Sequence, residues 1–335
     1  MIKLLSPENN AVIDTHTDLQ NTFIDTIYAQ GTDKALEWLL PRKNNIERSH
    51  PNPLVLEWTN DGSTEYEVFV SETEDFENAK VFKTTSTTYS LVNLKIGQQY
   101  FWKVNNSAVG TFSTKNNRFR FVKVDGLLNM RDLGGINIKQ GLLYRGSEIH
   151  DDELSIEESG KSTFIEDLGI KTQMNLRLEG APSLPHSYVG EQVAYAFLPY
   201  RPYKEVFYDD HRKGLRKIFE FLADESHYPI YFHCFGGADR TGMIALFLRC
   251  LLDEPEEDIL VDYEITSLSI YAAGVAEGVS SLGFRNRKCD YFVEFLDLLE
   301  PYAPGGTLND KVKNFLLDCE ISKETLDKVI SNIKK

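Results

Sequence analysis

Apolar and polar residues alternate in short runs through the first third of the chain. Since alternate side chains of a strand point to opposite faces, this period predicts strands at residues 54–58, 66–70, 90–92, 100–104 and 109–113. Turn-forming residues, such as those at 60–62 and Gly97, separate the runs. Short strands at near-regular spacing predict an antiparallel β-sandwich over residues 1–116.

A helical period interrupts this pattern once. Residues 17–40 predict two helices, and Pro41 is expected to end the second because proline cannot continue a helix. A plain sandwich contains no such helices. We therefore expect them to form an insertion or a cap within the first domain.

From about residue 118 the period changes repeatedly between helix and strand. Residues 161–168 and 210–223 have a helical period, whereas residues 171–176, 194–198 and 230–232 are strand-like. Strands that alternate with helices predict a mostly parallel sheet flanked by helices, an α/β domain over residues 118–335. Residues 115–121 are the expected linker, and the chain after Gly242 is expected to be mostly helical.

Composition and charge exclude several classes of function. The 335 residues carry 36 basic and 51 acidic side chains, a net charge of −15, and both predicted domains are acidic. We therefore expect no nucleic-acid binding. The four cysteines form no metal-ligand spacing, and no apolar run reaches membrane-spanning length. No metal, no cofactor and no membrane span is expected.

The N-terminus has no apolar core or cleavage site of a signal peptide. The cytoplasm is therefore the default compartment. A secreted or cell-surface location would apply if a leader had been removed.

Residues 230–242 carry the strongest chemical signal. A strand-like run leads into HCFGGADRTG at residues 233–242, and a helical period follows. A loop that enters a helix N-terminus collects backbone N–H groups and positive potential in one concavity, which suits a phosphate. Arg240 would hold two phosphate oxygens in a bidentate fork. The same field would make Cys234 a thiolate nucleophile.

This pattern resembles the phosphate-binding loop of cysteine-based protein tyrosine phosphatases. Two upstream stretches, NMRDLGG at residues 129–135 and LYRGSE at residues 143–148, resemble the opening motifs of the bacterial family that includes secreted phosphatases of mycobacteria and Listeria. The Asp262-Tyr263 run and residues 316–330 are also similar. The resemblance covers about residues 120–335. In the first domain, residues 56–58, 66–68 and 100–104 resemble a fibronectin type III domain.

The resemblance implies roles for the loop residues. Cys234 forms a phosphocysteine intermediate and Arg240 stabilises the transition state. The phosphate cradle consists of Phe235, Gly236, Gly237, Ala238, Asp239 and Arg240. Thr241 has two interpretations, a hydrogen-bond donor to the Cys234 sulfur or an ordinary threonine at a helix N-terminus. His233 either orients the loop or is a buried structural histidine.

The general acid has more than one candidate. An aspartate at the position of Asp239 is typical of the bacterial family. Other tyrosine phosphatases use an aspartate on a separate loop, which here would be residues 199–210. No aspartate follows Pro199 directly, so that alternative rests on Asp209 or Asp210, and both could equally be helix N-caps.

These residues predict a metal-independent phosphomonoesterase, with phosphotyrosine in a protein, or a small phosphomonoester, as substrate. One alternative is a phosphoinositide or inositol-polyphosphate phosphatase. Basic residues near the loop favour it, namely Arg201, Lys204, His211, Arg212 and Lys213. Ala238 stands where the family often has lysine, which weakens it. A second alternative is a phosphate-binding pseudophosphatase. For the sandwich we expect a protein or glycan partner.

Overall fold

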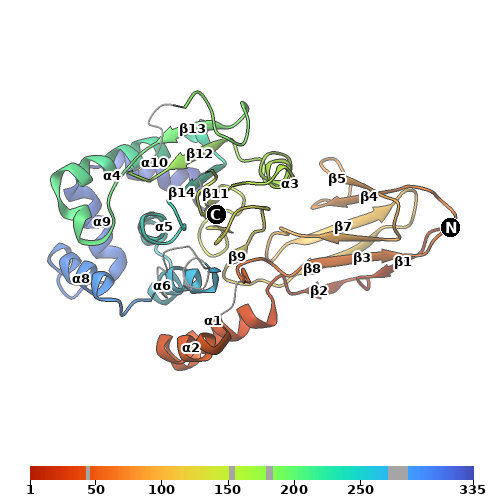
Figure 1. Cartoon of the computed structure of the whole chain (residues 1–335), viewed down its shortest axis with the longest axis horizontal. Helices are drawn as coiled ribbons and strands as arrows, with labels where there is room; N and C mark the ends of the chain where they lie inside the picture. Colours follow the sequence, from red (N-terminus) through yellow and green to blue (C-terminus); the bar gives the residue numbers. More distant parts are fainter. Residues whose placement is uncertain (43–45, 151–154, 179–183, 271–285) are drawn as a thin grey trace. The chain divides into compact units, whose positions relative to one another are not determined.

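The chain forms two compact units in the computed structural model, which describes residues 1–42, 46–150, 155–178, 184–270 and 286–335 (Figure 1). Unit 1 comprises Met1–Thr17 and Pro51–Phe121. Unit 2 comprises Asp18–His50 and Val122–Lys335. Each is described by itself.

Unit 1 contains two β-sheets. The first has the order β1 (Leu4–Ser6), β3 (Leu54–Trp58), β6 (Thr88–Leu91). The second has the order β2 (Ala11–Ile13), β8 (Gly110–Thr114), β7 (Gln99–Val104), β4 (Tyr66–Ser71), β5 (Lys80–Thr84). Residues of both sheets, among them Leu56, Val68 and Trp102, form one buried cluster.

The predicted strands of unit 1 are confirmed, with ends shifted by one or two residues. Strands β1, β2 and β5 were not predicted, because two of them have only three residues and β5 is largely exposed. One pairing differs from the expected antiparallel pattern, since β2 runs parallel to β8. The likeness of this unit to a fibronectin type III domain stays a prediction.

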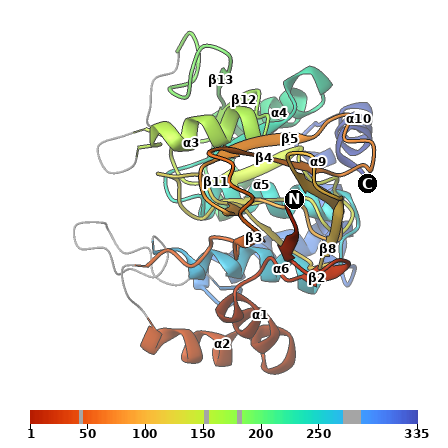
Figure 2. The same ribbon diagram turned by 90° about the vertical axis from the view of Figure 1, so that its right-hand side faces the viewer.

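The two helices predicted at residues 17–40 are present as α1 (Asp18–Gln30) and α2 (Thr32–Leu39), followed by the 3-10 turn η1 (Leu40–Arg42). We expected these helices to be an insertion or a cap within the first domain, but they belong to the compact unit 2. Thr32 Oγ1 donates to Glu264 Oε1 at 2.8 Å, and Tyr28 donates to Asp258. Both acceptors belong to α6 (Glu256–Ile265), and Figures 1 and 2 show α1 beside α6. Such long-range contacts leave no periodic signal in the sequence.

Unit 2 is built around a mixed sheet. Within unit 2 the strand order is β13 (Ala194–Phe197), β12 (Thr172–Asn175), β14 (Ile230–His233), β11 (Leu143–Gly146), β10 (Arg131–Asp132), and the two-residue strand β9 (Arg120–Phe121) falls within unit 1. The four strands from β13 to β11 are mutually parallel, and β10 pairs antiparallel with β11. The expected α/β architecture is therefore present, with a sheet that is parallel from its edge strand β13 to β11 and antiparallel at β10.

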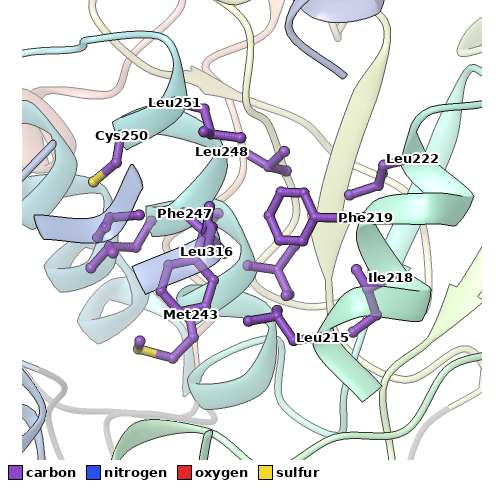
Figure 3. Close-up of a cluster of buried hydrophobic side chains, with 14 of the residues drawn as sticks. Leu215, Ile218, Phe219, Leu222, Met243, Phe247, Leu248, Cys250, Leu251 and Leu316 are labelled. Carbon is purple, nitrogen blue, oxygen red and sulfur yellow. The ribbon is translucent and has the colours of Figure 1, made fainter. Parts of the chain in front are cut away.

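Both faces of this sheet are covered, and β14 shows how. Its alternate residues Ile230 and Phe232 belong to one buried cluster, while Tyr231 belongs to another and packs edge-on against Phe164. Helices α4 (Asp209–Leu222), α5 (Asp239–Leu251) and α9 (Leu308–Asp318) supply the first cluster. On the other face, the π-helical turn η2 (Thr163–Asp167), which continues helix α3 (Glu158–Ser162), supplies Phe164 to the second cluster. Figure 3 shows Phe219 of α4 directed toward Leu248 of α5.

The remaining elements are helical. They are α8 (Asp290–Leu299), α10 (Lys323–Ile333) and the 3-10 turns η3 (Tyr203–Phe207), η4 (Glu225–His227), η5 (Thr266–Leu268) and η6 (Glu300–Tyr302). The mostly helical character expected after Gly242 is confirmed where the structure describes the chain, and residues 271–285 lie outside that part. None of the described helices is both long and apolar enough to span a membrane.

Candidate active site

The loop after β14 lies at the carboxyl edge of the parallel strands. β14 ends at His233, residues 234–238 form the loop, and α5 begins at Asp239. In an open α/β sheet, this edge is where ligands bind. The Cys234 side chain is nearly buried there, with 4% of the residue exposed.

Gly237 is required by the shape of the loop. Its φ is +66°, a region that L side chains rarely adopt, and a Cβ atom there would lie 2.4 Å from the Gly146 carbonyl oxygen. The close approach of Gly237 and Gly146 shows that the end of β11 lies directly against the loop. The Glu148 backbone N–H, just after β11, donates to the Phe235 carbonyl at 2.7 Å.

Side chains from the two upstream motifs hold the loop carbonyls. Asn129 Nδ2 donates to the carbonyl oxygens of Gly236 and Gly237, at 3.1 and 3.2 Å. Arg145 Nη2 also donates to the Gly237 carbonyl, at 2.8 Å. The loop is therefore anchored through its carbonyl groups to β11 and to the segment before β10.

A buried charge network lies behind this anchor. Asp262 of α6 accepts from Arg131 Nε at 2.9 Å and from Arg145 Nη1 at 2.7 Å, and Arg249 Nη2 lies 3.5 Å away. Burial alone would raise the pKa of Asp262, but Arg131, Arg249 and Arg145 outweigh it and hold that pKa below its ordinary value. Burial, with Arg131 nearby, lowers the pKa of Arg145 to about 9 against the opposing effect of Asp262. Arg131 and Arg145 therefore support the loop and depend on Asp262.

His233 is fully buried and has partners at both ring nitrogens. Nδ1 lies 2.9 Å from the Cys234 carbonyl oxygen and 3.4 Å from Glu148 Oε2. Because both neighbours are acceptors, Nδ1 carries the proton, and Nε2 then accepts from Gln173 Nε2 at 2.9 Å. Arg177 Nη1 donates to the same Glu148 oxygen at 2.7 Å. The imidazole thus connects the loop backbone to Glu148, which combines both interpretations of this residue.

A cavity of about 680 Å³ opens over the loop. The wall includes both Cys234 and Arg240, which the sequence places six positions apart. Its lining residues are Arg177, Leu178, Arg201, Pro202, Tyr203, Glu205, Cys234, Phe235, Gly236, Asp239, Arg240 and Tyr291. Three arginines, two carboxylates and three aromatic rings therefore surround one thiol.

The three candidates for the general acid differ in whether they line this cavity. Asp239 lines it and accepts a hydrogen bond from the Tyr203 hydroxyl. Asp209 and Asp210 begin α4 instead, and neither is among the residues that line the cavity in the described part of the chain. Asp210 is exposed and lies 3.4 Å from Lys213 Nζ.

Thr241 lies at the start of α5, and its side chain bears on the two interpretations that the sequence leaves open. Its Oγ1 is buried and has no hydrogen-bond partner, Cys234 Sγ included, among the residues that the structure describes. The first turn of α5 places the side chain in a fully enclosed position. The structure therefore does not connect Thr241 to the thiol.

The basic residues near the loop are not gathered at the cavity. Of the five, Arg201 lines it. Lys204 pairs with Glu294, Arg212 with Asp318 and Lys213 with Asp210, all outside the lining. Ala238 is buried at the start of α5.

Sequence reasoning did not single out Arg177, Tyr203 or Tyr291. Arg177 follows β12, whose carboxyl end lies beside that of β14, so its place after a parallel strand was an available signal. Tyr291 comes from α8, over fifty residues beyond the loop. No local pattern points from there to Cys234.

Comparison with known proteins finds a family match within unit 2. Residues 122–279 match the family model of the tyrosine phosphatase family. The chain is thus a protein-tyrosine-phosphatase-like hydrolase. No curated protein matches it.

Two solved structures are similar to part of the chain. One is the core catalytic domain of the PP-IP phosphatase SIW14 from S. cerevisiae in complex with citrate. It has 19% identity and a TM-score of 0.31, over 39% of this chain and 76% of that chain. The other is a Siw14 catalytic core, with 21% identity and a TM-score of 0.30, over 38% of this chain and 73% of that chain.

Proposed function

We propose that the chain hydrolyses phosphotyrosine in proteins through a phosphocysteine intermediate on Cys234. The observation that carries this proposal is the cavity in which Cys234 and Arg240 meet at the N-terminus of α5. A helix N-terminus and a guanidinium both favour a bound phosphate dianion. The carbonyls of Gly236 and Gly237 accept from Asn129 and Arg145, which fixes the backbone of the loop whose N–H groups are the proposed phosphate cradle.

The chemistry has two steps. The Cys234 thiolate attacks phosphorus, the bond to the ester oxygen breaks, and that oxygen takes the electron pair together with a proton from Asp239. Water then attacks the phosphocysteine and gives a proton to Asp239, and the P–S bond breaks to release phosphate and the thiolate. Arg240 and the loop N–H groups stabilise the charge on the equatorial oxygens in both steps.

Aromatic residues in the wall support an aryl phosphate as substrate. Phe235, Tyr203 and Tyr291 line the same cavity as the thiol, and the Tyr203 and Tyr291 rings are 4.6 Å apart. Flat apolar surfaces of this kind pack against a phenyl ring. A phosphoserine side chain is shorter and has no ring to fill that space.

A second candidate is a phosphoinositide or inositol-polyphosphate phosphatase. Arg177 and Arg201 line the cavity in addition to Arg240, and they would bind further phosphate groups. Glu148 already neutralises part of the Arg177 charge, and Arg201 lies 3.5 Å from Glu205. This weakens the second candidate relative to the first.

A substrate panel tests the proposal. The full chain is incubated with phosphotyrosine peptides, phosphoserine peptides, soluble inositol phosphates and p-nitrophenyl phosphate, and released phosphate is measured. We expect the highest kcat/KM on phosphotyrosine peptides, and higher values on the inositol phosphates would favour the second candidate. Cys234→Ser should reduce kcat by on the order of a thousandfold or more while phosphate still binds. Binding without turnover by the unaltered chain would indicate a pseudophosphatase.

A further inference from the structure

Two tyrosines from distant segments form a hydrogen-bonded chain that ends on Asp239. The Tyr203 hydroxyl donates to Asp239 Oδ1, and the oxygens of Tyr203 and Tyr263 are 2.7 Å apart. Tyr203 begins η3, Tyr263 belongs to α6, and Asp239 begins α5. Three elements thus meet at one carboxyl group beside the thiol.

The direction of this chain follows from counting protons. A tyrosine hydroxyl has one proton, and Tyr203 gives its proton to Asp239. The hydrogen bond between the two tyrosines can then be made only if Tyr263 donates and Tyr203 accepts. The donors therefore all point toward the Asp239 carboxylate.

Tyr203 is held firmly in this position. Its φ is +58°, an uncommon value for a residue with a side chain, and such strain persists only where the surroundings impose it. Its ring lies 4.6 Å from that of Tyr291 and 6.5 Å from that of Phe292, both on α8. Tyr263 is buried and packs 4.6 Å from Phe292. Helix α8 therefore supports both tyrosine rings.

We propose that Tyr203, backed by Tyr263, is a positioning residue for the general acid Asp239. The inference rests on the acid role proposed above for Asp239. The hydrogen bond from Tyr203 to Oδ1 fixes the orientation of the carboxyl group that gives its proton to the leaving group. The same orientation serves the second step, in which the carboxylate accepts a proton from water.

Other charged and titratable groups lie near Asp239 in the cavity. Around it lie Arg240 on its own helix, the thiol of the loop, and side chains of η3, α8 and the strand ends. They are Arg177, Tyr200, Arg201, Glu205, Cys234, Arg240 and Tyr291. The Tyr203 hydroxyl donates to Asp239 Oδ1. Removing that hydroxyl therefore tests this one contact while the other charged groups around Asp239 stay in place.

The test removes the Tyr203 hydroxyl and keeps the ring. For Tyr203→Phe we expect kcat on phenyl phosphate, a poor leaving group, to fall by about tenfold, because the carboxyl is no longer oriented. Hydrolysis of p-nitrophenyl phosphate, whose leaving group needs little protonation, should fall by less than about threefold.

Two further tyrosines serve as matched variants. Tyr263→Phe removes the backing donor and should lower kcat on phenyl phosphate by a smaller factor than Tyr203→Phe. Tyr208→Phe removes a hydroxyl from a residue that is 57% exposed and outside the cavity lining, and it should behave like the unaltered chain. If Tyr203→Phe does not fold, Tyr263→Phe gives the same test from within the helical core.

A double-mutant comparison separates this inference from the proposed function. If Tyr203 acts through Asp239, Tyr203→Phe should cause no further loss once Asp239→Asn is present. Additive losses, or equal losses on both esters, would overturn the positioning role. If Asp239→Asn itself shows no dependence on the leaving group, the acid role of Asp239 fails first. If it shows that dependence while Tyr203→Phe does not, only the positioning role fails.

Discussion

Asp262 shows how one buried carboxylate organises the residues beneath the loop. Arg131 and Arg145 contact it at hydrogen-bond distance, and both also reach the loop or the residue that anchors it. Removing one partner of a buried ion pair leaves an uncompensated charge, which costs far more than the pair contributes net. The site therefore depends on a residue that is not among those that line the described cavity.

Asp262→Asn should lower the free energy of unfolding by about 3–5 kcal/mol, because three arginines lose their shared counter-charge. Chemical denaturation followed by circular dichroism measures this. The folded-state pKa of Asp262 is below its ordinary value, so its contribution to stability is present above about pH 4 and is lost as the pH falls further. The difference between the variant and the unaltered chain should therefore shrink in acid. A difference that is constant with pH would contradict the charge argument.

Gly237→Ala should abolish most activity on any substrate. A Cβ would lie 2.4 Å from the Gly146 carbonyl oxygen, and φ of +66° disfavours alanine, so the loop must move away from β11. Gly305→Ala is a matched control, because Gly305 also has positive φ but meets nothing within 4 Å of its Cβ. Phosphatase assays of both variants, normalised to folded protein, give the comparison. Equal activity in the two would show that the contact with Gly146 is unimportant.

Thr241→Val should leave stability unchanged or increase it by up to about 1 kcal/mol. The buried Oγ1 has no partner in the described structure, and a hydroxyl in that situation costs free energy that a methyl group does not. Thermal unfolding measures the change. Kinetics test the other interpretation of this residue. If Thr241 donates to the Cys234 thiolate during turnover, Thr241→Val should have a lower kcat, and Thr241→Ser should keep the kcat of the unaltered chain.

The packing of α4 against α5 affects the loop, because α5 begins at Asp239, directly after the loop. Their contact is apolar, and Figure 3 shows Phe219 between Leu222 and the side chains of α5. The position of the α5 N-terminus therefore depends on a hydrophobic contact rather than on the loop alone.

Phe219→Ala should cost about 3–5 kcal/mol, the range for a buried phenylalanine that leaves a cavity. Leu317→Ala on α9 is the control, since that side chain is 45% exposed and should change stability by about 0.5 kcal/mol or less. Urea unfolding of both variants makes the comparison. A similar loss in both would mean that packing against α5 is not what makes Phe219 important.

Unit 2, which contains the candidate active site, is built from two separate segments of the chain. Helices α1 and α2 belong to unit 2 although residues 51–121 of unit 1 follow them in the chain. They bond to α6, which also carries Asp262 and Tyr263. A fragment of residues 118–335 keeps the loop but lacks these two helices.

This fragment should unfold at a lower temperature than the full chain, because the buried face of α6 loses its partners and becomes exposed. A peptide of residues 18–50 added in trans should raise the Tm again. Calorimetry with and without the peptide checks both statements. A fragment as stable as unit 2 of the full chain, and indifferent to the peptide, would show that the helices contribute nothing.

Local patterns were enough for several features. Most strands of unit 1, helices α1 and α2, and the strand–loop–helix around Cys234 could be predicted, because side-chain period and turn residues reflect the backbone conformation of a few neighbouring residues. The spacing between Cys234 and Arg240 is local in the same sense. The class of hydrolase follows from such local signals together with the family match.

Tertiary packing decided the rest. Only the fold brings Tyr203 and Tyr263 to Asp239, directs three arginines toward Asp262, and assigns α1 and α2 to unit 2. It also gives Asp239, and neither Asp209 nor Asp210, a place in the wall of the described cavity. These relations join residues tens to hundreds of positions apart. Such pairings depend on which faces are buried together, and the period of a single segment holds no record of its partner.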